Sequence, residues 1–169
     1  MPTSRPEELI EKLEAGGEKV WPLRALAGLE GGPKTPLQRL AGYLRTDPAK
    51  AVASASLVSS AEFFKLGPTP WALVYGEAVR TGAGPAAEAM RKVPYLSPSE
   101  AALFEALVRG EKAELAKDGL DDAIYAAGCV IRARNPQLSE KERQTLLTDA
   151  RARAPLLLTH PDAVSAWLP

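Results

Sequence analysis

Prolines preceded by a helix-capping residue recur along the chain and divide it into short segments. Four such pairs are Thr35-Pro36, Asp47-Pro48, Thr69-Pro70 and Ser97-Pro98. The side-chain oxygen of the first residue accepts a hydrogen bond from a free backbone N–H, and proline lacks the N–H that would go unpaired at the first helical position. Glycine most easily adopts the left-handed conformation that ends a helix. The corresponding stop signals are Gly16, Gly31, Gly67, Gly82 and Gly110.

Between these signals the sequence favours helices over strands. Alanine and leucine are common, and both are strong helix formers. No segment alternates apolar and polar residues over the length of a strand. We therefore predict an all-α fold, a single compact domain over residues 1–169 with about nine to eleven short helices, arranged in one body or as irregular stacked helical hairpins. The predicted helices are 5–15, 22–30, 36–45, 48–66, 70–81, 85–93, 98–109, 111–117, 120–134, 139–153 and 161–168.

Three of these helices carry an apolar stripe at helical spacing. The first stripe contains Trp71, Val74, Tyr75, Ala78 and Val79, the second Ala53, Leu57, Ala61 and Phe64, and the third Leu120, Ile124, Ala127 and Ile131. Short helices are marginal in water by themselves. We therefore expect the stripes to be buried against one another, with 120–134 as the most buried helix.

A weak internal repeat links three segments. Those that begin at Pro22, Pro36 and Pro70 each reach a glycine six residues later, at Gly28, Gly42 and Gly76. Each glycine lies roughly opposite the apolar stripe, where a mid-helix glycine costs about 1 kcal/mol relative to alanine. A second helix packed closely on that side would explain the glycine, and a chance match among capping prolines and common residues is the alternative.

The charge of the chain is balanced, with 21 basic and 21 acidic residues. Phosphate binding by the whole chain is therefore not expected. The C-terminal third is the most basic stretch, and its candidate nucleic-acid contacts are Arg132, Arg134, Lys141, Arg143, Arg151 and Arg153. A phosphate backbone is the partner that such residues would bind. Cations near helix C-termini are also stabilising without any ligand, so a solvated face is the alternative.

Residues that carry catalysis are scarce. The chain has one cysteine, Cys129, and one histidine, His160. A zinc site of the usual nitrogen and sulfur type therefore cannot be built within one chain. Asp118, Asp121 and Asp122 cluster near a helix N-terminus, where the helix dipole favours negative charge, and a magnesium site is the alternative. We expect neither a metal nor a cofactor. A lone cysteine in an alanine-rich helix is more typical of a packed hydrophobe than of a nucleophile. A helical cleft near Tyr125 and Cys129, for a small molecule or an enzymatic activity, remains an alternative.

Two tryptophans are candidate contacts for a partner. Trp21 precedes a capping proline, and Trp167 lies near the C-terminus. Tryptophan is enriched among the residues that dominate binding at protein interfaces, although such a residue can also fold back onto its own chain. We expect an interaction or assembly subunit without catalytic activity, which binds a protein partner or itself. An accessory nucleic-acid-binding subunit of a larger complex is the alternative.

No apolar run approaches the roughly 20 residues that span a bilayer. Together with the polar N-terminal stretch and the single cysteine, this predicts a cytoplasmic protein without membrane contact. Asparagine occurs once, at Asn135. Such depletion is typical of thermostable proteins, and a GC-rich genome gives the same bias.

Overall fold

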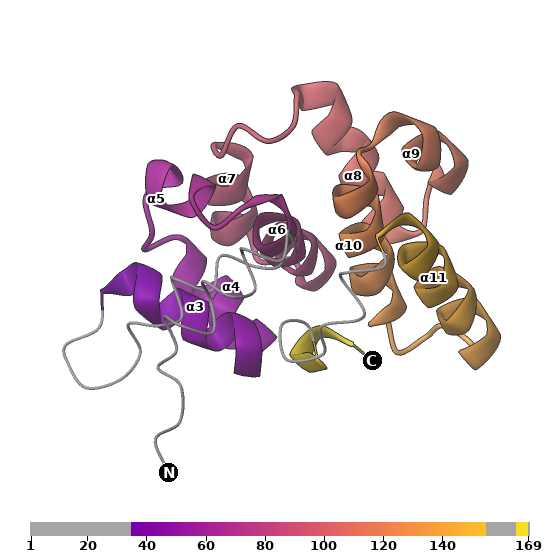
Figure 1. Cartoon of the computed structure of the whole chain (residues 1–169), viewed down its shortest axis with the longest axis horizontal. Helices are drawn as coiled ribbons and strands as arrows, with labels where there is room; N and C mark the ends of the chain where they lie inside the picture. Colours follow the sequence, from indigo (N-terminus) through magenta and orange to yellow (C-terminus); the bar gives the residue numbers. More distant parts are fainter. Residues whose placement is uncertain (1–34, 155–164, 169) are drawn as a thin grey trace, which may run out of the picture.

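The computed structural model describes residues 35–154 and 165–168, and these residues form an all-α fold (Figure 1). They contain nine α-helices, one 3-10 turn and no strand, which confirms the predicted fold class. The predicted helices 5–15 and 22–30, the first four residues of the predicted helix 161–168, and the residues Trp21 and His160 lie outside the described residues. The elements are α3 (Pro36–Thr46), α4 (Pro48–Ala55), α5 (Ser60–Phe64), α6 (Pro68–Thr81), α7 (Gly84–Arg91), α8 (Pro98–Arg109), α9 (Ala113–Gly119), α10 (Asp122–Ala133), α11 (Glu140–Arg153) and the turn η1 (Ser165–Trp167).

Capping residues begin three of the helices as predicted. Thr35, Asp47 and Ser97 cap α3, α4 and α8, and each side chain accepts a hydrogen bond from the backbone N–H three residues later. The prediction for Thr69 is wrong, because α6 begins at Pro68, two residues before the predicted start at Pro70, and its N-cap is Gly67. Gly67 has a φ of 96°, a conformation that glycine adopts most readily, so this glycine turns the chain into α6.

The predicted helix 48–66 is in fact two helices, α4 and α5, separated by a turn. Ser59 begins the second helix by accepting a hydrogen bond from the backbone N–H of Glu62. Serine favours caps and turns because its hydroxyl competes for backbone groups, and this stretch contains several serines. The stripe predicted on this segment is also wrong, because all four of its members are exposed: Ala53, Leu57, Ala61 and Phe64.

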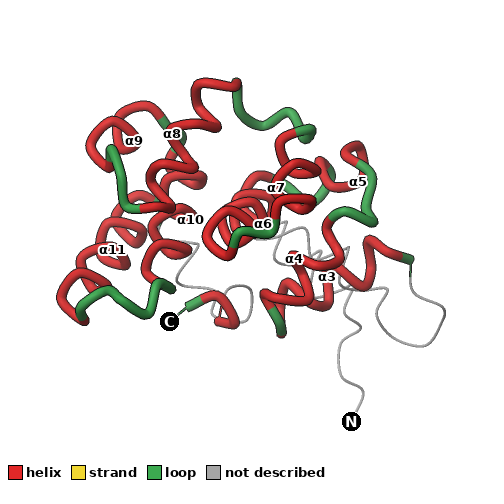
Figure 2. Tube along the Cα trace, turned by 180° about the vertical axis from the view of Figure 1, so that it is seen from behind, coloured by secondary structure: helices red, strands yellow, loops and turns green. Residues whose placement is uncertain are grey.

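Helices α6 and α10 lie at the centre of the molecule (Figures 1 and 2). Helix α6 packs against α4, α5, α7, α8 and α10, and α10 packs against α6, α8 and α11. Every residue over 70–78 and over 124–131 is buried. A helix that is buried on all sides needs neighbours all round it, and the outer helices supply them. The apolar stripes predicted for these two helices are therefore part of the core.

Glycines allow the central helices to approach closely. A Cβ atom added to Gly76 of α6 would lie 3.0 Å from Cγ1 of Ile131 on α10. A Cβ atom added to Gly128 of α10 would lie 2.6 Å from Cδ2 of Leu107 on α8. For Gly76, the prediction of a second helix packed against the glycine is confirmed. None of the described helices is long and apolar enough to cross a bilayer.

Candidate functional site

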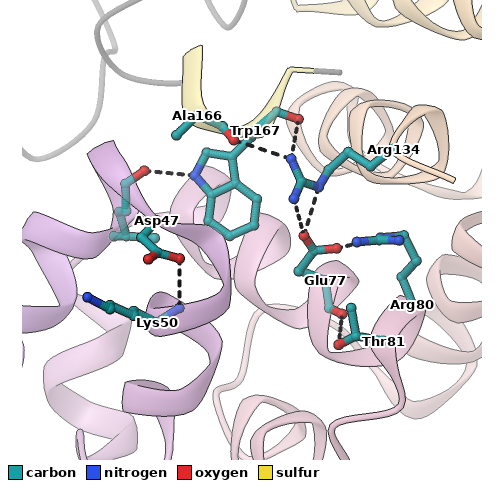
Figure 3. Close-up of polar contacts among 9 residues, drawn as sticks. Asp47, Lys50, Glu77, Arg80, Thr81, Arg134, Ala166 and Trp167 are labelled. Atoms are coloured by element: carbon teal, nitrogen blue, oxygen red, sulfur yellow. Dashed lines mark hydrogen bonds and ion pairs between the residues drawn. The ribbon is translucent and has the colours of Figure 1, made fainter. Parts of the chain in front are cut away.

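One of the predicted basic residues, Arg134, joins two helices to the C-terminal segment of the chain (Figure 3). Its guanidinium group lies 2.7 Å from the carboxylate of Glu77 on α6. The Nη1 atom also donates to the backbone carbonyls of Ala166, at 3.2 Å, and Trp167, at 3.1 Å. Guanidinium groups are always protonated in proteins, so these are charge-assisted hydrogen bonds. Arg134 is therefore used within the chain.

Glu77 is the buried charged residue that organises this arrangement. It is the one polar or charged side chain among the described residues that is fully buried. Its Oε2 atom accepts from Arg134, and its Oε1 atom accepts from Nε of Arg80 at 2.5 Å. Burying a carboxylate is costly unless it is paired and hydrogen-bonded, and the two arginines meet that requirement.

Trp167, near the C-terminus, contacts both Leu44 on α3 and Arg134. Its indole Nε1 donates to the carbonyl of Leu44 at 2.7 Å, and its ring lies under the guanidinium of Arg134, 5.7 Å from the ring centroid. Leu44 lies in the last turn of α3, where carbonyls lack partners within the helix. Trp167 is buried within its own chain, the alternative noted for a terminal tryptophan, and it offers no free surface to a partner in this conformation.

We call this set of residues the C-terminal junction: Leu44, Glu77, Arg80, Arg134 and Trp167. It contains neither a nucleophile nor a neutral acid–base group such as histidine. Its polar contacts hold a peptide segment. Arg134 binds two backbone carbonyls of that segment, and the Leu44 carbonyl binds its indole N–H. The junction is suited to holding a chain segment in place.

Two more of the predicted basic residues have internal partners. Arg143 donates to the carbonyl of Ala133 at 2.9 Å, where α10 ends, and pairs with Glu140 at 2.9 Å. Arg153 pairs with Asp122 at 2.9 Å and lies over the ring of Tyr125. These contacts fasten α11 to α10 and fit the stabilising role that cations have near helix ends.

The remaining basic residues are placed differently. Lys141 and Arg151 are exposed on α11, whereas Arg132 is half-buried with its guanidinium beside Gly110. Of the six predicted nucleic-acid contacts, three thus make ion pairs within the chain, two are exposed on α11, and Arg132 is half-buried.

Tyr125 and Cys129 are both buried, so neither presents a face to a cleft in this conformation. Burial raises the pKa of the Cys129 thiol to about 11, against a smaller opposing contribution from the hydrogen bond with Tyr125. Burial also raises the pKa of Tyr125, with the neighbouring Cys129 adding to the effect. Because the thiolate is the reactive form, Cys129 is a poor nucleophile at neutral pH.

A second cluster of charged residues lies on the other side of α6, between α7 and α8. Glu105 accepts hydrogen bonds from the hydroxyl of Tyr75 and from Arg91, whose Nη2 atom lies 2.9 Å from Oε1. Arg109 approaches the same carboxylate at 3.5 Å. Burial raises the pKa of Glu105, but the hydrogen bonds from Arg91 and Tyr75 outweigh it and leave this pKa below its ordinary value.

Glu77 and Glu105 are not among the candidate residues predicted from the sequence. For Glu77 a signal exists, because Glu77 and Arg80 are the only charged residues in α6, a helix that is otherwise apolar or small. A single carboxylate on a helix with a predicted apolar stripe indicates a buried ion pair. No protein-family model, curated protein or solved structure matches this chain.

Proposed function

We propose that this chain is a helical interaction or assembly subunit without catalytic activity of its own. The observation that carries the proposal is the exposure of large apolar side chains on the described surface. Leu57 is 69% exposed, Leu115 is 59% exposed and Phe64 is 45% exposed. Exposed aromatic and aliphatic residues of this kind are the ones that interfaces bury.

Phe64 is the strongest candidate among these residues because it is held in place by the core. Its ring stacks on Tyr95 with centroids 4.6 Å apart, and Tyr95 in turn contacts Trp71 at 5.3 Å. An aromatic side chain that is already ordered loses little conformational entropy when a partner covers it. Phe64 therefore has the properties of a contact residue for another protein.

The contacts that the polar groups make within the chain support the same proposal. Glu77, Glu105 and three of the predicted basic residues make contacts that join helices, and Cys129 is a buried, protonated thiol. Catalytic groups need access to a substrate as well as suitable chemistry. Glu77, Glu105 and Cys129 make their contacts within the fold, whereas the large apolar side chains of Leu57, Phe64 and Leu115 are accessible.

The test compares Phe64→Glu with a matched control, Lys65→Glu, at the neighbouring exposed position. Each purified full-length chain serves as bait in extract from its native cells, and its own association is measured by sedimentation velocity. We expect a stoichiometric complex with the wild type and the control, weakened about tenfold or more by Phe64→Glu. A wild-type chain that forms no complex, with itself or with any protein, would contradict the proposal.

The nucleic-acid alternative is tested in parallel by a gel shift over a range of salt concentrations. Phosphate contacts weaken steeply with salt, and Lys141→Glu and Arg151→Glu would reduce such binding. We expect no salt-dependent shift under conditions in which the protein complex forms. A shift that both substitutions abolish would favour the nucleic-acid function instead.

A further inference from the structure

The C-terminal segment, residues 165–168, is held like a docked peptide. One side chain, Trp167, is fully buried as an anchor, and its indole N–H binds the Leu44 carbonyl. Arg134 holds the backbone through the carbonyls of Ala166 and Trp167. A buried aromatic anchor combined with main-chain hydrogen bonds is how proteins bind extended or turn-forming peptides.

The site that receives this segment is built without it. We call it the acceptor site: the end of α3 at Leu44, Glu77 on α6 and Arg134 at the C-cap of α10. Glu77 pairs with Arg134, and Arg80 pairs with Glu77, so part of what holds the guanidinium comes from α6 and does not involve the segment. Figure 3 shows Trp167 set between these helices. If the segment left, the Leu44 carbonyl and the Nη1 atom of Arg134 would lose their partners, which is a free-energy cost that favours an occupant.

We propose that the acceptor site also receives the C-terminal segment of a second copy of this chain, so that two copies exchange these segments and form a closed dimer. This inference rests on the proposed role as an assembly subunit. The choice of occupant rests on the contacts within one chain, where the chain's own segment fills the site, and on the fact that each copy carries both the segment and the site. In an exchanged dimer every contact of the junction recurs between copies, and exchange of an identical element is a low-cost route to a dimer.

The position of the segment in the chain is compatible with exchange. Ten residues separate Ala154 from Ser165 in the sequence. Ten residues reach at most about 35 Å when extended. Helix α11 packs on α10, whereas the turn η1 packs on α3, so the segment already docks away from the helix that precedes it (Figure 1). Docking within one chain is favoured by its high effective concentration, so we expect exchange to increase with protein concentration.

The test uses two complementary full-length variants. Trp167→Ala removes the anchor and keeps the acceptor site, whereas Arg134→Gln weakens the acceptor site and keeps the anchor. In sedimentation velocity we expect wild-type dimers that increase with concentration, and monomers for each variant alone. We expect an equimolar mixture of the variants to form a one-to-one heterodimer, because one copy supplies the segment and the other supplies the site.

A peptide competition keeps the inference testable if either variant fails to fold, as judged by circular dichroism. A synthetic peptide of residues 161–169 should convert the wild-type dimer to monomers, and the same peptide with Trp167→Ala should not. A wild-type chain that is monomeric at all concentrations would overturn the exchange, while the Phe64 test would still decide the proposed function. A wild-type dimer that is unchanged by the peptide and retained by Trp167→Ala would also overturn the exchange, and would leave the proposed function in place through another surface.

Discussion

Two carboxylates, Glu77 on α6 and Glu105 on α8, make similar ion pairs in very different surroundings. The side chain of Glu77 is 3% exposed and binds Arg80 and Arg134, whereas that of Glu105 is 13% exposed and binds Arg91 and Arg109. The arginines of the first cluster are mostly covered, and those of the second are about half exposed to solvent. The same chemistry therefore acts as an internal connection at Glu77 and as a partly solvated contact at Glu105.

The difference shows what burial adds to an ion pair. Exposed ion pairs contribute little to stability, because water and salt screen the charges. Breaking a buried pair by removing one partner leaves a charge without compensation and is far more costly. Glu77 also connects distant parts of the chain, since Arg134 links it to the carbonyls of residues 166 and 167. The Glu105 cluster joins α6, α7 and α8, which are near in sequence.

Removing each carboxylate tests this comparison most directly. Glu77→Ala leaves Arg134 partly buried without its counter-charge, and we expect the free energy of unfolding to fall by about 3 to 5 kcal/mol. Glu105→Ala is the matched control, and we expect a loss of about 1 to 2 kcal/mol, because its arginines can be solvated. Urea denaturation followed by circular dichroism measures both. If both variants lost the same free energy of unfolding, the difference in burial between Glu77 and Glu105 would not affect stability.

The close approach of α6 and α10 beside Glu77 can be disturbed at Gly76. In Gly76→Ala the new methyl group would press on Ile131, and such overpacking costs about 1 to 3 kcal/mol. The gain in helix propensity offsets about 1 kcal/mol of this, so we expect a net loss of stability. Gly84→Ala is the control, because nothing lies within 4 Å of its added Cβ atom, and it should be neutral or stabilising. If the midpoint of thermal unfolding of Gly76→Ala were equal to or higher than that of Gly84→Ala, α6 and α10 would move apart at little cost.

The elements that the sequence predicts well are those that depend on near neighbours. The cap at Thr35 needs only the residues next to it, and the apolar stripe from Trp71 to Ala78 needs only helical spacing. The error in helix 48–66 is also local. There, Ser59 starts a new helix, and the predicted stripe with Leu57 turns out to be exposed.

The junction could not be predicted in this way because its partners are distant in sequence. Glu77 and Arg134 are separated by 57 residues, and Leu44 and Trp167 by 123. The basic character of the C-terminal third was visible, but a charge count does not distinguish an arginine that pairs internally from one that faces solvent. Arg134 and Arg151 look alike in the sequence, yet only the first is enclosed by the fold.

The Glu105 cluster can be probed at its buried end by Tyr75→Phe. The Tyr75 hydroxyl donates to Glu105, and burial and the nearby carboxylate raise its pKa, so it stays protonated as a donor. Phenylalanine keeps the ring in the core and removes this hydrogen bond, for an expected loss of about 1 kcal/mol. Tyr43→Phe on α3 is the control, in urea denaturation at neutral pH. If Tyr75→Phe lowered the free energy of unfolding as much as Glu77→Ala does, the Glu105 cluster would behave energetically as a buried ion pair.

The smallest expected effect is the contribution of Glu105, the more solvated carboxylate, to the pH dependence of the free energy of unfolding. The pKa of Glu105 lies below its ordinary value in the folded chain, mainly because the hydrogen bonds from Arg91 and Tyr75 outweigh burial. A carboxylate whose pKa is lowered by folding contributes stability above its unfolded pKa of about 4.3 and loses it as the pH falls through the folded value. We therefore expect the stability difference between the wild type and Glu105→Gln to be constant from neutral pH down to about pH 5, and to shrink below pH 4. The comparison cancels the titration of the other acidic groups, since both proteins contain them. A difference that grew on acidification would mean that folding raises the pKa of Glu105, and that its surroundings resemble a desolvated site more than a solvated ion pair.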